Sequence, residues 1–253
     1  MSFIDTIISK IAPHDCLACG VERQLLCASC VNKLDAVPEC CYRCGLPSPG
    51  CLTCPDCRLT TDLYAVKAAA AYSGTAKDLI WKLKSGGAQA AASVMASRMV
   101  LQLERRNNPL ITSVFAATMR PGQGHKVLIV PVPTATSRVR ARGYDQARLL
   151  ARQLAHQTGL PYAGCLARLG QTHQVGAGRQ QRLEQLGRSF YVKRHYLVKN
   201  AHIILVDDVI TTGASLETAA RVLKTAGAAR VEALTFAQVV TKKQIDSEGT
   251  FDI

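Results

Sequence analysis

The sequence contains few aromatic residues and no long apolar run. Aromatic side chains make up 5% of the 253 residues, and one of them is a tryptophan, Trp81. This scarcity disfavours an extended platform on which nucleic-acid bases could stack, and we expect Trp81 to be a packing anchor instead. No apolar run approaches the roughly 20 residues of a membrane-spanning helix. Internal repeats, coiled-coil heptads and a low-complexity tail are also missing.

Acidic residues are scarce, and their scarcity is concentrated in one segment. Residues 120–200 hold fourteen lysines and arginines but only two acids, whereas the whole chain has a net charge of +13. A basic segment of this kind attracts polyanions such as pyrophosphate or nucleic acid. The competing interpretation, a solvated helix face, usually intersperses both signs of charge. We therefore expect an anion-binding surface in this segment.

The beginning of the sequence lacks the basic residues that start a secretory signal peptide. Its first eleven residues instead place five apolar side chains on one helical face, with an acid among them at Asp5. We expect a docking helix there, with contact to a membrane surface as the less favoured alternative. Because no signal for secretion is present, we also expect a cytoplasmic location.

Cysteines, in contrast, are abundant, and ten of the eleven lie within residues 16–57. They recur as pairs separated by two residues. A CxxC turn places two thiolates on one side of a tight bend, and two such turns complete a tetrahedron around zinc. The simplest assignment is two sequential structural zinc sites, with the ligands Cys16, Cys19, Cys27 and Cys30 in the first and Cys41, Cys44, Cys54 and Cys57 in the second.

Other arrangements of these cysteines remain open. The pairs could interleave, and of the spare cysteines Cys40 and Cys51 the latter could replace a nearby ligand. A disulfide framework is the main rival, but it requires an oxidising compartment, for which the sequence has no secretory signal. Gly20 and Gly45 follow the second cysteine of a pair, where a zinc knuckle often needs a positive φ. The isolated Cys165 is expected in the core.

The composition changes near residue 60, where the cysteines stop. We place an N-terminal helix and a double zinc ribbon in residues 1–60, an α/β domain in residues 61–240 and a tail in residues 241–253. Strands alternating with helices indicate a parallel, doubly wound sheet with helices on both faces, which binds ligands at the carboxyl ends of its strands. Hydrophobic patterns predict strands at 64–72, 126–131, 163–168, 202–206 and 230–237, and helices at 75–84, 88–106, 145–158 and 214–226.

The most informative string runs from Ile203 to Ser215. Four apolar residues, typical of a buried parallel strand, end at two adjacent acids, Asp207 and Asp208. A short loop of small and hydroxylated residues then opens a helix at about Ser215, and the N–H groups at such a helix start suit a phosphate. The acids cannot face that phosphate, so they must serve hydroxyls or a metal. A ligand with a phosphate beside a vicinal diol is a ribose 5-phosphate.

A second segment, residues 130–147, is expected at the same edge of the sheet. Two prolines stiffen a turn that leaves the strand ending at Pro131, and three arginines follow at alternate positions. Guanidinium groups bind phosphate oxygens in a bidentate way. We therefore expect an anion to be held here, close to the acids.

Residues 203–215 as a whole resemble the phosphoribosyl pyrophosphate (PRPP) signature of type I phosphoribosyltransferases. The resemblance implies that Asp207 and Asp208 contact the 2′ and 3′ hydroxyls of the ribose. Arg138 and Arg142 would hold the pyrophosphate of PRPP. A solvent-facing acid pair at a strand end is the alternative, and it does not account for a match at every position. The loop would hold the 5-phosphate through Thr211, Thr212, Gly213, Ala214 and Ser215.

The order of the motifs resembles the ComF family, including its ComFC- and GntX-like members, over about residues 14–238. The CxxC module, Val-Pro-Val-Pro, Arg-Gly-Tyr-Asp-Gln-Ala and the acidic string follow one another as in that family. Lys84 matches the lysine of a Leu-Lys pair before glycine. Residues 172–182 resemble a mobile loop that covers the site, with Arg182 as its matched cation. Gln185 departs from the asparagine that is common there and lengthens the amide side chain.

The resemblance implies a type I phosphoribosyltransferase-like sheet domain that transfers ribose 5-phosphate from PRPP to a nucleophile. Mg²⁺ would bridge the ribose hydroxyls and the pyrophosphate, because hard cations prefer oxygen ligands. Asp207 and Asp208 would stabilise the positive charge of an oxocarbenium-like transition state. The family is linked to DNA uptake during bacterial natural transformation, so the implied partners are single-stranded DNA and the competence machinery.

A second hypothesis is a non-catalytic module on the same fold that binds single-stranded DNA. The basic middle segment and the zinc ribbons favour it, and the low aromatic content weakens it. A zinc-ribbon transcription regulator is disfavoured because the ribbons are not basic. The sequence identifies neither the acceptor nor a general base for it.

Overall fold

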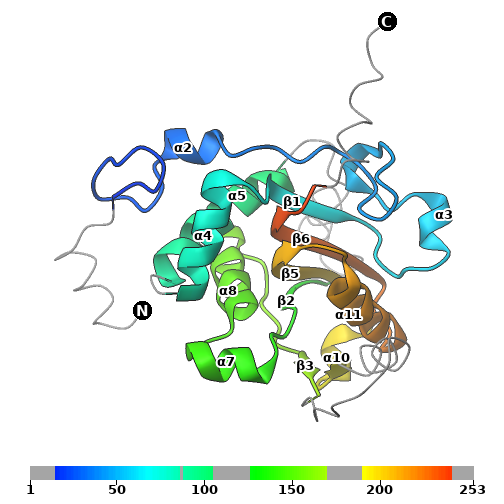
Figure 1. The fold of residues 1–253 in the computed structure, drawn as a ribbon. Coiled ribbons are helices and arrows are strands. Elements are labelled where there is room, and N and C mark those ends of the chain that lie inside the picture. The colour runs from blue at the N-terminus through cyan, green and yellow to red at the C-terminus, as the bar shows by residue number, and fades with distance from the viewer. Residues whose placement is uncertain (1–14, 86–87, 105–125, 170–189, 241–253) are drawn as a thin grey trace, which may run out of the picture.

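The computed structural model describes residues 15–85, 88–104, 126–169 and 190–240 (Figure 1). Four parallel strands form its central sheet in the order β1-β6-β5-β2. An isolated parallel bridge between Ile129 and Tyr162 extends the β2 edge. The strands are β1 (Val66–Ala71), β2 (Val127–Pro131), β5 (His202–Ile210) and β6 (Arg230–Gln238).

Helices cover both faces of this sheet because the strands are apolar on both sides. Ile204 and Val206 of β5 face one core, which contains α4 (Gly74–Ser85), α5 (Ala88–Glu104) and α8 (Gln146–Thr158). Ile203 and Leu205 face the other core, which contains α11 (Ala214–Thr225) and the end of α10 (His195–Val198). Figure 1 shows the two helical layers on opposite sides of the sheet. The predicted parallel sheet with helices on both faces is confirmed.

The two cysteine-rich segments pack on different parts of the sheet domain. The first contains α2 (Ala28–Asn32), and its Leu25, Leu26 and Leu34 join the core that includes α5. The second contains η1 (Pro49–Cys51) and α3 (Pro55–Arg58), and its Tyr42 packs against the α11 core. Figure 1 shows the segments well separated, α2 lying near α5 and α3 lying beyond β1. Each ribbon therefore contacts its own region of the sheet domain.

Three features of the fold differ from the sequence prediction. The short strand expected at 163–168 is β3 (Leu166–Arg168), which pairs antiparallel with β4 (Phe190–Val192) outside the main sheet. The stiff turn expected after Pro131 contains a helix, α7 (Thr136–Arg142). The strand expected to end at residue 206 continues to Ile210. Three-residue strands carry too little pattern to reveal their pairing direction, and an arginine-rich helix lacks an apolar face.

The described residues contain no helix that is long and apolar enough to cross a membrane. The docking helix expected at the beginning of the chain, the covering loop with Arg182, and the tail at 241–253 lie outside the described residues. The domain boundaries at residues 60 and 240 stay a prediction.

Candidate functional site

The acids lie where β5 runs past the end of its neighbour. The pairing of β2 with β5 stops at Pro131 and Val206, whereas β5 continues beside β6 to Ile210. Among the described strands, none pairs with the β2-facing edge of β5 beyond Val206. The helices that follow β2 and β5, α8 and α11, cover opposite faces of the sheet. Ligands of open α/β sheets bind at the carboxyl ends of strands arranged in this way.

The alternation of β5 changes at the two acids. Leu205 and Ile210 both face the α11 core, and Val206 and Val209 both face the α8 core. In a regular strand, residues separated by an odd number of positions face opposite sides, so the alternation is interrupted within this stretch. At this point the carboxylates of the two acids accept hydrogen bonds from backbone N–H groups. Asp207 Oδ1 accepts a hydrogen bond from the Asp208 N–H at 2.9 Å, and Asp208 Oδ1 accepts one from the Val209 N–H at 2.9 Å. Each carboxylate keeps its second oxygen for another partner.

The two acids are in different electrostatic surroundings. Burial, together with the carboxylate of Asp208, raises the pKa of Asp207 well above its ordinary value. Asp208 has a cation instead, since Lys84 Nζ lies 2.7 Å from its Oδ2. Lys84 comes from the last turn of α4. The structure thus brings together three of the residues that the sequence singled out.

The expected phosphate loop, residues 211–215, directly follows β5. Gly213 is the N-cap of α11 and has a φ of 78°, which favours glycine. It has no side chain with which to cap the helix, so the first N–H groups of α11 are left for another acceptor. Thr211, Thr212 and Ala214 are exposed. An uncapped and accessible helix start is suited to a phosphate.

The arginines of the second predicted segment lie on α7. Arg138 and Arg142 are four residues apart and share one face of this helix, whereas Arg140 projects from another face. The loop that carries α7 is closed at its base, because Asp145 accepts hydrogen bonds from the hydroxyl and the N–H of Thr134 at 2.9 and 3.2 Å. Asp145 is also the N-cap of α8.

Tyr144 connects the α7 loop to α4. Its hydroxyl donates to the carbonyl oxygen of Leu83 at 2.7 Å, one residue before Lys84. Gly143, with a φ of 81°, ends α7 and lets the chain turn toward α8. The string from Arg142 to Ala147 therefore fixes the arginine helix and the end of α4 relative to each other.

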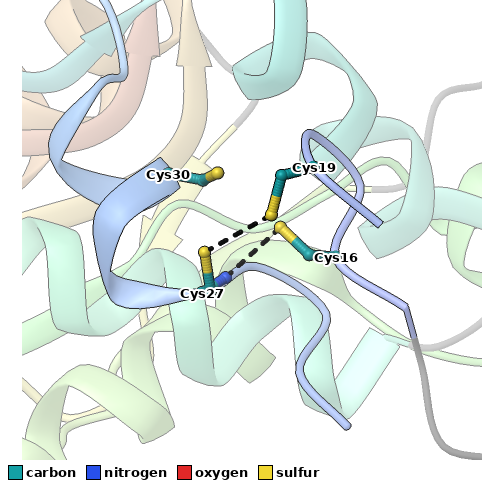
Figure 2. A group of neighbouring side chains, drawn as sticks. All are labelled: Cys16, Cys19, Cys27 and Cys30. Atoms are coloured by element: carbon teal, nitrogen blue, oxygen red, sulfur yellow. Dashed lines mark hydrogen bonds between the residues drawn. The ribbon is translucent and has the colours of Figure 1, made fainter. Parts of the chain in front are cut away.

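Eight cysteines form the two clusters that the spacing predicted. In each cluster the four sulfur atoms lie within 4.8 Å of one another, and the groups are sequential rather than interleaved. The Sγ atoms of Cys19 and Cys27 are 3.7 Å apart, as are those of Cys44 and Cys54. A tetrahedron with Zn–S bonds of about 2.3 Å has edges of about 3.8 Å, so both clusters could bind zinc. Figure 2 shows the first four side chains directed toward a common centre.

Other features of the cysteines agree with metal sites. All eleven are free thiols. Burial raises the pKa of Cys16, but hydrogen bonds from backbone N–H groups outweigh it and lower the pKa to about 6. Gly20 and Gly45 have φ values of 73° and 81°, as predicted for zinc knuckles. Cys51 lies outside both clusters, and Cys165 is buried in the core as expected.

Comparisons with known proteins agree with this architecture. The chain matches the model of the phosphoribosyl transferase domain over residues 139–249. It is 27% identical to competence protein ComFC of Bacillus subtilis over 81% of this chain and 80% of that one. DNA utilization protein YhgH of Salmonella typhimurium is also 27% identical, over 82% and 87% of the two chains. Competence protein F of Haemophilus influenzae is 32% identical over 41% and 47%.

These relatives confirm the predicted resemblance to the ComF family.

The structure adds Arg168, at the end of β3, which the sequence did not single out. Its guanidinium lies within electrostatic range of Arg138 and Asp207, and burial together with Arg138 lowers its pKa. Its Nε is buried and makes no hydrogen bond among the described residues. The guanidinium stacks 5.4 Å from the centre of the Phe190 ring. No sequence signal could identify it, because the pairing of β3 with β4 brings it there.

The expected role of Trp81 as a packing anchor is wrong. Its side chain is 63% exposed on α4, while Leu79, Ile80 and Leu83 of the same helix are buried. These three residues form the buried apolar face of α4, and Trp81 lies on the exposed side of the helix. Lys82 lies 5.8 Å from its ring centre.

Taken together, the site offers hydrogen-bond acceptors on the one hand, and N–H donors and cations on the other. Carboxylate oxygens of Asp207 and Asp208 can accept hydrogen bonds from hydroxyls. Uncapped N–H groups lie on the α11 side, Lys84 and Arg168 lie near the acids, and Arg138 lies near Arg168. Such a site can bind a ligand that has hydroxyls in its middle and anionic groups at both ends.

Proposed function

We propose that this protein binds PRPP together with Mg²⁺ at the carboxyl end of β5. The observation that carries the proposal is the acid pair on the open edge of β5, followed within six residues by the uncapped start of α11. PRPP has a vicinal diol between a 5-phosphate and a pyrophosphate, which matches this order of acceptors and donors. The match to the phosphoribosyl transferase domain supports the same ligand class.

Each group has a proposed role in transfer of the ribose 5-phosphate. The bond from ribose C1 to pyrophosphate breaks, and a bond from C1 to the acceptor forms. Asp207 and Asp208 hold the ribose hydroxyls and stabilise positive charge on the ring. Arg138, Arg142 and Arg168 stabilise the departing pyrophosphate. Magnesium, when bound, would neutralise charge on the pyrophosphate oxygens.

We also propose that both cysteine clusters hold structural zinc and that the protein acts in DNA uptake. Four thiolates fill a tetrahedral zinc and leave no position for a substrate. Two of the relatives are named competence proteins and another a DNA utilization protein, which supports a role with incoming DNA.

Calorimetric titration with Mg²⁺-PRPP tests the site. We expect a micromolar dissociation constant for the unmodified chain, and a value about tenfold higher or more for Asp208→Asn, because a hydrogen bond to a charged group contributes about 1.5–3 kcal/mol. Binding should strengthen as the pH rises, since the raised pKa of Asp207 keeps it protonated at low pH and the hydroxyls need its carboxylate.

Glu22→Gln is the matched control, because it removes one negative charge from an exposed residue of the first ribbon. It should leave the titration unchanged. The proposal fails if the unmodified chain gives no heat with Mg²⁺-PRPP, or if Asp208→Asn binds as tightly as the control.

A second candidate function is a module that binds single-stranded DNA, and the exposed Trp81 favours it. Lys77, Lys82 and Lys84 lie on the same helix, so α4 combines an aromatic ring with cations. Base stacking on an aromatic side chain contributes about 1–3 kcal/mol, so Trp81→Ala should weaken binding of an oligothymidine about tenfold. Fluorescence anisotropy with a labelled oligonucleotide measures this.

Tyr196→Ala is the control for the strand-binding experiment, because Tyr196 is an even more exposed aromatic residue and lies on a different helix, α10. It should bind the oligonucleotide like the unmodified chain. Equal binding by Trp81→Ala would contradict a role for α4. Tight, salt-sensitive strand binding without any PRPP heat would favour the module over the transferase.

A further inference from the structure

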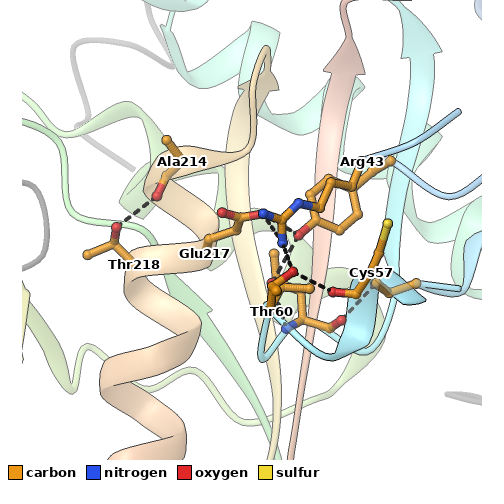
Figure 3. A network of polar contacts seen from close by, with 10 residues as sticks. Arg43, Cys57, Thr60, Ala214, Glu217 and Thr218 are labelled. Carbon is orange, nitrogen blue, oxygen red and sulfur yellow. Dashed lines mark hydrogen bonds and ion pairs between the residues drawn. The ribbon is translucent and has the colours of Figure 1, made fainter. Parts of the chain in front are cut away.

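A turn of the second cysteine cluster contacts the expected phosphate loop, residues 211–215, and the first turn of α11. Two residues, Tyr42 and Arg43, lie between its ligands Cys41 and Cys44, and both reach α11. The Tyr42 hydroxyl donates to Glu217 Oε1 at 2.8 Å, and Arg43 Nη1 lies 3.7 Å from the same oxygen. Figure 3 shows Arg43 and Glu217 meeting between the ribbon and the first turn of α11.

The ring of Tyr42 also lies against the backbone of Gly213. A Cβ atom added to Gly213 would be 2.9 Å from Cε2 of Tyr42 and 3.3 Å from its Cδ2. Real Cβ atoms do not approach other carbon atoms this closely, so the ring occupies the space that any side chain at position 213 would need. The N-cap of α11 is thus covered on one side by the ribbon.

The contacts connect both ends of one helical turn. Glu217 donates its N–H to the carbonyl oxygen of Gly213 at 2.9 Å, so the Tyr42 ring touches one end of this turn and its hydroxyl binds the other. Thr61 lies 3.0 Å from the Tyr42 oxygen and supplies its second hydrogen bond. Arg43 donates to the hydroxyl of Thr60 at 2.6 Å. The ribbon side of the contact is therefore itself held in place.

The described contacts of the first cluster lie elsewhere in the fold. Its residues join the core that includes α5, and Leu17, which follows Cys16 as Tyr42 follows Cys41, packs against that core. The two clusters therefore differ in what they hold, although their ligand spacing is similar.

We infer that the second cysteine cluster is a structural support of the phosphate loop, and that Tyr42 is a positioning residue for the N–H groups of α11. Metal in this cluster fixes the Cys41–Cys44 turn, and the turn fixes Gly213 and Glu217. Loss of the metal, or of the tyrosine, frees the start of α11 without touching Asp207 or Asp208. The link to ligand binding rests on the proposed function, whereas the support of the loop does not.

Hydrogen–deuterium exchange of the full chain without ligand tests the support itself. Tyr42→Phe keeps the ring against Gly213 but loses both hydrogen bonds, so exchange of the Glu217 amide, which bonds to the Gly213 carbonyl oxygen, should rise about fivefold, as expected for a modest hydrogen bond. Tyr42→Ala should raise it further. Glu217→Gln still accepts from the tyrosine hydroxyl and should retain most of the protection. Zinc content by mass spectrometry should remain at two per chain in Tyr42→Phe.

Leu17→Ala is the matched control, because it changes the same position of the first CxxC turn. It should leave exchange of the Glu217 amide unchanged. Unchanged exchange in both Tyr42 variants, or an equal rise in Leu17→Ala, would overturn the inference.

Titration with Mg²⁺-PRPP then tests the link to the ligand. Tyr42→Phe should weaken binding about fivefold at unchanged zinc content. If the unmodified chain does not bind PRPP, the proposed function fails, and the exchange experiment still decides whether the ribbon supports the loop.

Discussion

A Cys44→Ser variant is expected to lose one of two zinc ions and to unfold its ribbon locally. Cys44 Sγ lies 3.7 Å from Cys54 Sγ within the second cluster, and a serine cannot replace the thiolate. Structural zinc supplies on the order of 10 kcal/mol of apparent folding free energy in small zinc domains. We therefore expect residues 40–60 to lose their protection from hydrogen exchange, and the melting temperature to fall. Zinc analysis and calorimetry measure both effects.

Two controls make this result specific. Cys51→Ser should keep two zinc ions per chain, because Cys51 lies outside both clusters. A loss of zinc in Cys51→Ser would show that the ligand assignment is wrong. Cys19→Ser should also lose one zinc, but its effect should be confined to the first ribbon and the α5 region that it covers. If hydrogen exchange of residues 211–217 rose equally in Cys19→Ser and Cys44→Ser, a separate role for the second cluster would be contradicted.

A Gly213→Ala variant is expected to lose most of its affinity for PRPP. The methyl group meets the ring of Tyr42 at 2.9 Å, and the φ of 78° is one that alanine rarely adopts. The positive φ alone costs about 1–2 kcal/mol, and relief of the contact requires either the ring or the loop to move. We expect a loss of affinity of more than about tenfold and a lower midpoint of denaturation. Titration calorimetry and urea denaturation measure the two quantities.

Gly159→Ala separates the strain of the backbone from the contact with the ribbon. Gly159 has a similar φ of 69° at the end of α8, and a Cβ there would meet nothing within 4 Å. It should be destabilised by the same cost of a positive φ, about 1–2 kcal/mol, and bind PRPP normally. If Gly213→Ala were no worse than Gly159→Ala in either measurement, the close approach of Tyr42 would be of no consequence.

Much of the fold could be predicted because its elements have strong local patterns. The apolar run of β2, the beginning of β5 and the amphipathic helix α8, with Asp145 before it and Gly159 after it, appear in the sequence within a residue of their observed bounds. The continuation of β5 through Asp207 and Asp208 could not be predicted, because two adjacent acids normally indicate the end of a buried strand. Pairing with β6 alone keeps this stretch extended.

The candidate site was predictable in part for the same reason. The acids and the loop after them are contiguous, so their chemistry is visible in one string. Tyr42 and Arg168 were missed, because an aromatic residue between two zinc ligands and an arginine in a short strand have ordinary structural explanations. Tyr42 and Glu217 are 175 positions apart in the sequence, and no local pattern relates them.

The sequence by itself determined the two cysteine clusters, the parallel sheet and the acid-and-loop string, since spacing and periodicity act over a few residues. Only the tertiary structure decided that Lys84 pairs with Asp208, that Arg168 lies near Asp207, and that the second ribbon covers the phosphate loop. The order of the strands and the faces covered by the helices set these contacts. Such contacts depend on the packing of the whole chain, because each joins residues that share no element.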